Sequence, residues 1–171
     1  MKQFTAIHPE DMPGNPFQMI GADWMLITAR DGGQVNTMTA SWGGLGVMWG
    51  KHVAYIAVRP SRYTKKFIDA ADTFSLTFFD PSFRKELAYL GAVSGRDEPK
   101  IPKSGLTVVL AGETPYFEEA RLVLICRKIY HQVYDPAGFL DPTIMKNYPK
   151  QDYHTFYIAE VTQVLVGEDK A

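Results

Sequence analysis

The sequence has little or none of several features that would assign a protein to a class directly. It holds one cysteine, Cys126, so it can form no intramolecular disulfide and no cysteine-based structural zinc site. Its 18 Lys and Arg residues balance 19 Asp and Glu residues, which gives a formal net charge of −1 at pH 7. That balance gives no electrostatic reason to expect nucleic acid or an anionic membrane surface as a partner.

Long apolar runs are missing too. The longest run in the strand-like stretches, LVLIC at residues 122–126, is far too short to cross a bilayer. Residues 1–14 contain no apolar stretch of the kind that a secretory signal needs. The four histidines show no metal-ligand spacing, and no G-x-G-x-x-G, Walker A or G-x-S-x-G sequence occurs. We therefore expect a cytoplasmic protein without a metal, and neither a Rossmann dehydrogenase nor an α/β-hydrolase.

Most of the chain reads as strands joined by turns. Asp31-Gly32-Gly33 is a hairpin-turn signal between two of them. The expected strands cover residues 24–29, a segment ending at 36–41, and residues 52–59, 73–79, 119–134 and 154–167. Because a parallel α/β sheet needs a helix after most strands, this order favours a closed or nearly closed antiparallel barrel. We predict a mainly β fold, with two or more short helices, in a single domain over residues 1–171.

Two short helices are expected between the strands. In DPSFRKELAYLG, Asp80 is the predicted N-cap, Pro81 the first helical residue and Gly91 the C-terminal stop. The other helix lies within RPSRYTKKFIDAAD, with Ser61 as its N-cap. The earlier segment DMPGNPFQMIG, residues 11–21, is predicted to be an extended arm because proline and glycine interrupt it.

The charges of the RPSRYT helix run against the helix dipole. Arg62, Lys65 and Lys66 lie in or near its first turn, where acidic residues are favoured, and each such charge costs roughly 0.3–1 kcal/mol. A phosphate bound at this end would compensate for them. Its donors would be Arg59, Ser61, Arg62 and Thr64. Solvated surface charges explain the same pattern equally well.

A row of hydroxyl groups lies on one face of the strand within NTMTASWGGLG. Thr37, Thr39 and Ser41 share that face, and apolar residues occupy the other. An exposed hydroxyl face is ordinary on an antiparallel sheet, and for this strand alone it is the favoured interpretation. Trp42 and the glycines after it indicate instead a planar or bulky ligand close to the backbone.

Three motifs together make the chain resemble the flavin reductase-like, FMN-binding split-barrel family, and within it the flavoredoxin-like proteins. The motifs are NTMTASWG (36–43), RPSRYT (59–64) and SGRDEPK (94–100), and the resemblance spans roughly residues 17–166. It implies an antiparallel split barrel of Greek-key type. Pro99 departs from the family pattern, in which a second acidic residue often precedes the lysine. By composition alone, residues 94–105 would be a plain solvated connection.

The resemblance also implies a cofactor site. The strand at residues 37–42 would lie along FMN, the RPSRYT segment would take the phosphate, and Lys100 and His154 would approach from other elements. The cofactor-binding residues implied in this way are Thr37, Met38, Thr39, Ala40, Ser41, Trp42, Arg59, Ser61, Arg62, Thr64, Ser94, Gly95, Lys100 and His154. Tyr63 is expected to pack rather than to bind, and no side chain is assigned as catalytic.

The resemblance implies an FMN-dependent oxidoreductase that passes electrons from NADH or NADPH to a flavin, ferric or protein acceptor. A homodimer with FMN near the subunit interface is also implied. One alternative is a non-catalytic FMN-binding protein or electron carrier of the same fold. A more distant alternative is a related barrel that binds another phosphorylated ring, such as pyridoxal phosphate, or haem. The long segment at residues 134–154 would shape access to the flavin or pack a dimer.

Overall fold

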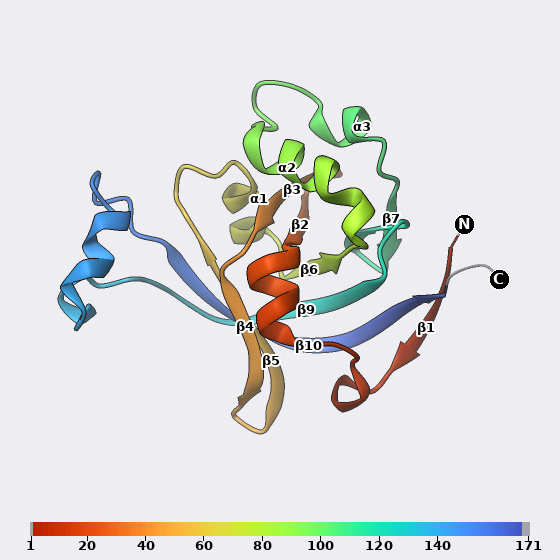
Figure 1. Cartoon of the computed structure of the whole chain (residues 1–171), viewed down its shortest axis with the longest axis horizontal. Coiled ribbons are helices and arrows are strands. Elements are labelled where there is room, and N and C mark those ends of the chain that lie inside the picture. Colours follow the sequence, from red (N-terminus) through yellow and green to blue (C-terminus); the bar gives the residue numbers. More distant parts are fainter. Residues whose placement is uncertain (1, 169–171) are drawn as a thin grey trace.

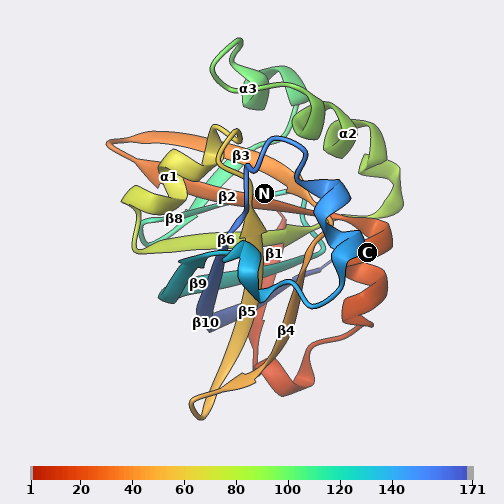
Figure 2. The same cartoon turned by 90° about the vertical axis from the view of Figure 1, so that its left-hand side faces the viewer.

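A curled antiparallel sheet forms the body of the protein in the computed structural model, which describes residues 2–168. Its eight strands are β1 (Gln3–Ile7), β2 (Met25–Asp31), β3 (Gln34–Ala40), β4 (Gly43–Met48), β5 (Lys51–Val58), β6 (Thr73–Phe78), β9 (Leu122–Val133) and β10 (Thr155–Glu168). They pair in the order β3-β2-β6-β9-β10-β5-β4, and β1 adds to β10. This architecture confirms the predicted antiparallel split barrel (Figures 1 and 2).

The split in the barrel follows from the strand order. β3 and β4 lie at the two ends of the main strand order, yet they are consecutive in sequence and joined only by Ser41 and Trp42. Each edge strand leaves one side of its backbone without a ladder partner. A ligand at this seam can therefore reach unpaired backbone groups.

β2 is buried on both of its faces. Ile27 belongs to the cluster inside the barrel, whereas its neighbour Leu26 belongs to a second cluster under the helices. Successive strand residues point to opposite faces, so a strand covered on both sides reads as a continuous apolar run. The apolar residues at 24–27 fit this arrangement.

The helices are short, and those that pack directly on the large sheet contact β2 and β3. They are α1 (Thr64–Ala70), α2 (Arg84–Ala92) and α3 (Lys100–Ser104). In Figure 1, α2 and α3 lie on the side of the molecule that carries β3, away from the β4–β5 hairpin. A small second sheet pairs β7 (Val108–Ala111) with β8 (Thr114–Phe117). Neither that sheet, β1 nor α3 was predicted.

The prediction for the helix boundaries was partly wrong. Asp80 and Pro81 begin a 3-10 turn, Pro81–Phe83, and α2 itself starts at Arg84. Gly91 is not the stop, because the helix continues to Ala92. A Cβ at Gly91 would lie 3.1 Å from the Cβ of Thr39, so glycine serves here to let α2 approach β3 closely.

Two further predictions near the RPSRYT segment and the N-terminus were wrong. Ser61 is not an N-cap, since α1 begins at Thr64 with Tyr63 as its cap residue and without a side-chain capping bond. The arm predicted over residues 11–21 is not extended throughout, because it runs into a π-helix, Gln18–Asp23. That segment is too short to show the repeated apolar spacing from which helices are recognised in sequence.

The glycines of β4 have a structural role. An ideal Cβ on Gly43, whose φ is +156°, would lie 2.4 Å from the carbonyl oxygen of Tyr55. Cβ atoms on Gly44 and Gly46 would lie 3.1 and 3.0 Å from atoms of the Tyr55 side chain. The close approach predicted from GGLG is therefore an approach to β5, and not evidence of a ligand.

Candidate functional site

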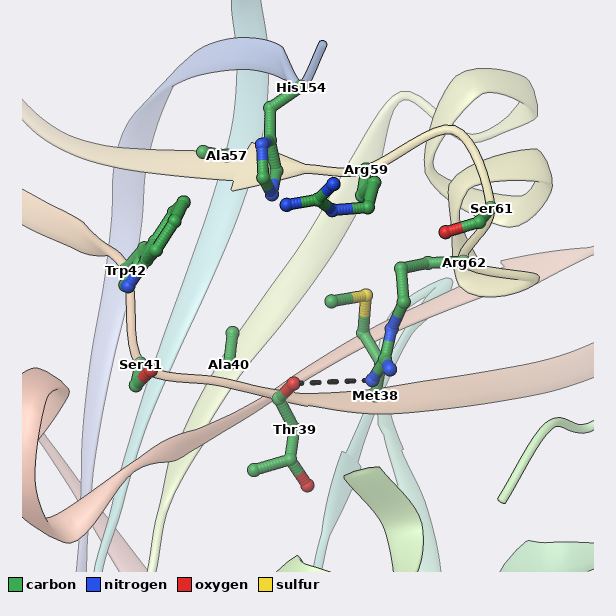
Figure 3. A pocket seen from close by; sticks show the side chains of 10 residues that line it. All are labelled: Met38, Thr39, Ala40, Ser41, Trp42, Ala57, Arg59, Ser61, Arg62 and His154. Carbon is green, nitrogen blue, oxygen red and sulfur yellow. Dashed lines mark hydrogen bonds between the residues drawn. The ribbon is translucent and has the colours of Figure 1, made fainter. Parts of the chain in front are cut away.

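A cavity of about 320 Å³ opens at the seam of the barrel (Figure 3). β3 and the link to β4 form one wall, and the end of β5, the turn before α1 and the start of β10 form the other. The lining residues are Met38, Thr39, Ala40, Ser41, Trp42, Ala57, Arg59, Ser61, Arg62 and His154. All of these except Ala57 were predicted as cofactor-binding residues. The structure thus brings together residues from three distant parts of the sequence.

The hydroxyl face of β3 does not look into this cavity. Thr37 is fully buried, and its hydroxyl lies 2.8 Å from that of Thr28 and donates to the Ile27 carbonyl. The Thr39 hydroxyl donates to the Leu87 carbonyl of α2, and Figure 3 shows the side chain pointing away from the cavity. For Thr37 and Thr39 the expectation that the row faces a ligand was therefore wrong, because β2 and α2 occupy their hydroxyls. Ser41, the third member of the row, does line the cavity.

The apolar face of β3 lines the cavity instead. In Figure 3, Met38 and Ala40 point toward the space between the walls. Short or flexible apolar side chains leave the strand backbone accessible beside them. A flat ligand can therefore lie against the outer edge of β3 and meet its unpaired backbone groups.

Arg62 supplies an uncompensated positive charge at one end of the cavity. Its Nη1 donates to the Gly91 carbonyl at 2.9 Å and its Nη2 to the Thr39 carbonyl at 3.4 Å, and within residues 2–168 it forms no ion pair. Burial lowers the pKa of its guanidinium, which nevertheless stays charged at neutral pH. A desolvated cation that is held only by neutral carbonyls is ready to bind an anion.

Arg59 lies in the same cavity, but its charge is balanced. Its Nη1 donates to Oδ2 of Asp152 at 2.7 Å, and its Nη2 donates to the Asn147 carbonyl at 3.1 Å. The guanidinium also lies over the Tyr148 ring, 5.2 Å from its centroid. The hydrogen bond from Arg59 holds the pKa of the Asp152 carboxyl below its usual range. Arg59 therefore anchors the 134–154 segment to the cavity wall.

Aromatic rings form the other end of the cavity. The His154 and Trp42 rings lie 5.2 Å apart between centroids at an angle of 42°. Burial, with the nearby charge of Arg59, lowers the pKa of His154 to about 4, so the imidazole is neutral at pH 7. Its Nδ1 lies 2.8 Å from the Tyr148 hydroxyl. When that hydroxyl donates, Nε2 carries the proton and can donate to a ligand.

The reversed charges of α1 have internal partners in part. Lys65 forms an ion pair with Asp69 at 2.6 Å, and Lys66 lies 4.0 Å from a carboxylate oxygen of Asp31. These two lysines do not need an anion to compensate them. Of the three cations near the first turn of α1, only Arg62 lacks a carboxylate partner among the described residues and could be compensated by a phosphate.

Several predicted residues lie outside this cavity. Thr64 is buried and accepts a hydrogen bond from Asn36 at 2.9 Å. Gly95 and Lys100 line a neighbouring cavity of about 370 Å³, and Ser94 lies in the loop beside them. The Lys100 ammonium donates to the carbonyls of Leu90 and Val93, at the end of α2, at 2.7 and 2.8 Å. These carbonyls are groups that the helix itself leaves unbonded.

The charge of Lys100 still acts on the candidate site. Burial lowers the pKa of Lys100 to about 8, and the charge of Arg62 contributes to the shift. The two cations therefore raise the positive potential at the Arg62 end.

Ala57, the one lining residue that was not predicted, has a small apolar side chain that suggests no binding role by its chemistry. Its alternation with Arg59 on β5 would have placed it on the same face.

Two absences concern the described residues alone. Within residues 2–168, no group of three or more His, Cys, Asp or Glu side chains is arranged to hold a metal ion. No helix in that part of the chain is long and apolar enough to cross a membrane.

Comparisons with known proteins agree with the resemblance seen in the sequence. An FMN-binding domain of a flavin reductases-like enzyme from Shewanella baltica superposes with a TM-score of 0.71 at 17% identity, over 96% of this chain and 78% of that one. Flavoredoxin from Methanosarcina acetivorans gives 0.66 at 23% identity, over 83% and 67%. NADH:FAD oxidoreductase from Streptomyces globisporus gives 0.63 at 16% identity, over 85% and 78%. At these identities the likenesses show a shared fold.

The family assignment comes from the sequence model of a domain. No curated protein matches the chain. The model described as "Flavin reductase like domain" matches residues 18–171, which is most of the chain. The resemblance predicted from three motifs is confirmed, and the chain belongs to the flavin reductase-like domain family.

Proposed function

We propose that the protein binds FMN at the seam of the barrel and acts as an oxidoreductase that takes electrons from NADH or NADPH. The observation that carries this proposal is the pairing, in one cavity, of the uncompensated Arg62 cation with the aromatic His154–Trp42 end. FMN has matching parts, a phosphate at one end and a planar ring at the other. The family assignment and the similarity to the FMN-binding domain from Shewanella baltica support the choice of FMN.

The residues present fit that cofactor. Arg62 and the exposed Ser61 would hold the phosphate, and the charge of Lys100 would strengthen the attraction. The unpaired edge of β3 would meet the pyrimidine edge of the ring, which alternates donors and acceptors. Trp42 and His154 would flank the ring at the other end of the cavity.

The protein's own contribution is binding and electrostatics. Bound FMN supplies the chemistry, since it can accept a hydride from a nicotinamide and release electrons to an acceptor. The cations at the Arg62 end stabilise negative charge nearby, and a neutral His154 can donate a hydrogen bond without supplying a proton at pH 7. No side chain needs to act as a general acid or base. The acceptor would be a flavin, a ferric complex, a protein or another small molecule.

A homodimer is part of the proposal. Trp49 at the end of the β4–β5 hairpin and Tyr130 on β9 are both exposed, and their ring centroids lie 6.4 Å apart. Val47 and Val133 are exposed on the same two segments. Apolar side chains that gather on a surface favour association with another protein surface. Because β9 leads toward His154, a second copy bound here would lie near the FMN cavity. A cytoplasmic location completes the proposal.

An absorption spectrum tests the proposed function. We expect the purified protein to show two visible flavin bands, or to take them up from added FMN, and to lose them rapidly with NADH or NADPH in the absence of oxygen. Flavin bands that persist with both donors would contradict a reductase and favour an FMN-binding electron carrier. A colourless protein that takes up no FMN would contradict FMN binding itself.

A further inference from the structure

A second cavity adjoins the first at the link between β3 and β4. It has a volume of about 470 Å³ and is lined by the turn that leads into the π-helix Gln18–Asp23 and by residues 41–45. Ser41 and Trp42 line both cavities. The two cavities therefore share part of one wall, and a molecule in the second would contact the same two residues as a ring bound in the first.

The lining chemistry of this second cavity is aromatic and uncharged. Phe17 is 90% exposed and Trp42 is 48% exposed. Aromatic side chains of this size are usually buried in cores or interfaces. Among the described residues that line the cavity, none carries a charged side chain. The volume lies within the range of small-molecule sites. These properties select an uncharged, planar ligand that can stack on aromatic rings.

Gly21 lines this cavity, and close packing does not require glycine there. An ideal Cβ at Gly21 would meet no heavy atom within 4 Å, and the residue has no positive φ. Glycine inside a helix lowers the stability of the folded protein relative to alanine, because glycine loses more conformational freedom on folding. Gly43 and Gly44, which also line the cavity, are different, because their Cβ atoms would press against Tyr55.

We propose that this cavity binds the electron acceptor, and that the acceptor is a small, uncharged, planar conjugated carbonyl compound of the quinone class. This inference rests on the proposed FMN site beside it. The quinone receives two electrons and one proton as a hydride from reduced FMN and a second proton from water. It would leave as the hydroquinone, and NADH or NADPH would supply the two electrons and the hydride proton by way of the bound cofactor.

A second copy of the chain fits this cavity less well than a small molecule does. The exposed rings assigned to a dimer include Trp49, which lies beyond the far end of β4. A strand of that length separates it from Gly43 by roughly 20 Å. The cavity at Phe17 is thus a separate feature, concave and next to the site of electron transfer.

The test measures binding of 1,4-naphthoquinone to the oxidised, FMN-loaded protein by isothermal titration calorimetry, without a reductant. Gly21→Leu adds a large side chain at a residue that lines the cavity, where a Cβ would meet no heavy atom within 4 Å. Ala22→Leu is the matched control, since it adds the same side chain at the next residue of the π-helix, which is exposed and does not line the cavity. FMN affinity and sedimentation are measured for each variant.

We expect saturable binding to the unaltered protein and to Ala22→Leu, and at least tenfold weaker binding to Gly21→Leu, with FMN affinity and oligomeric state unchanged. Equal binding to both variants would overturn the site. Tighter binding of naphthalene-2-sulfonate than of the quinone would overturn the uncharged class. A change in oligomeric state for Gly21→Leu alone would instead assign the cavity to a second copy. A protein that takes up no FMN would contradict the proposed function. Normal FMN uptake without quinone binding would contradict only the inference about this cavity.

Discussion

The two arginines of the RPSRYT segment lie in one cavity with opposite electrostatic roles. Arg59 forms an ion pair with Asp152, and its guanidinium lies over the Tyr148 ring. Among the described residues, Arg62 donates hydrogen bonds only to the neutral carbonyls of Thr39 and Gly91. Residues three positions apart in the sequence thus form a neutralised end and an uncompensated end of the same site.

This difference shows that a charge acts on a ligand only to the extent that the protein leaves it unbalanced. An arginine that is paired with a carboxylate adds little attraction for a phosphate, because the phosphate must compete with the internal anion. It adds rigidity instead, here to the 134–154 segment. An arginine held by carbonyls keeps its charge for the ligand.

The largest effect is expected at His154, on the neutralised end. Its pKa is about 4 in the folded protein and near 6.5 in an unfolded chain. Between these values the unfolded chain binds a proton that the folded protein does not, so stability falls as the pH is lowered from 6.5 to 4. We expect a loss of about 2–3 kcal/mol from this residue. Urea unfolding between pH 4 and 7 measures it.

The His154→Asn variant separates this contribution from that of other titrating groups. Its free energy of unfolding should fall less over the same pH range, by the amount assigned to His154. Parallel profiles for the variant and the unaltered protein would show that the cavity does not hold the imidazole neutral.

The next largest effect is expected at the uncompensated end. Arg62→Ala should weaken FMN tenfold to a hundredfold, equivalent to roughly 1.5–3 kcal/mol, because a charge-assisted contact to the phosphate is lost. Riboflavin, which lacks the phosphate, should lose far less. Arg127→Ala, on the exposed part of β9, is the control and should alter neither affinity. Equal weakening of FMN and riboflavin would mean that Arg62 supports the cavity without contacting the phosphate.

The smallest effect on FMN affinity is expected for Arg59, and it is the most direct test of the difference between Arg59 and Arg62. Arg59→Ala should weaken FMN threefold or less, about 0.7 kcal/mol, because Asp152 already balances the charge. It should instead speed amide hydrogen exchange in residues 142–152, whose anchor is removed. Asp152→Asn should have the opposite sign and tighten FMN, since it leaves a second free cation. A loss on Arg59→Ala as large as that on Arg62→Ala would refute the distinction between the two ends.

Much of the fold and of the cavity lining could be predicted from sequence, but the orientation of the lining could not. Alternation along β3 correctly separated Thr37 and Thr39 from Met38 and Ala40, because the period of a strand is local. Which face meets the cavity depends on α2, which covers the hydroxyl face and accepts a bond from Thr39. The same holds for Lys100, whose ammonium is bound by the last carbonyls of α2.

The sequence by itself indicated most of the strands of the large sheet and the residue types that meet at the seam, since these depend on local periodicity and composition. Its single cysteine also excluded an intramolecular disulfide and a cysteine-based zinc site. The tertiary structure alone decided which of the two arginines is free. The partner of Arg59 lies 93 residues away, on a segment that the barrel brings back against β5. The structure also showed that the β4 glycines accommodate Tyr55, because close approach is a property of packed neighbours and not of spacing along the chain. It likewise placed Gly21 in the lining of a second cavity.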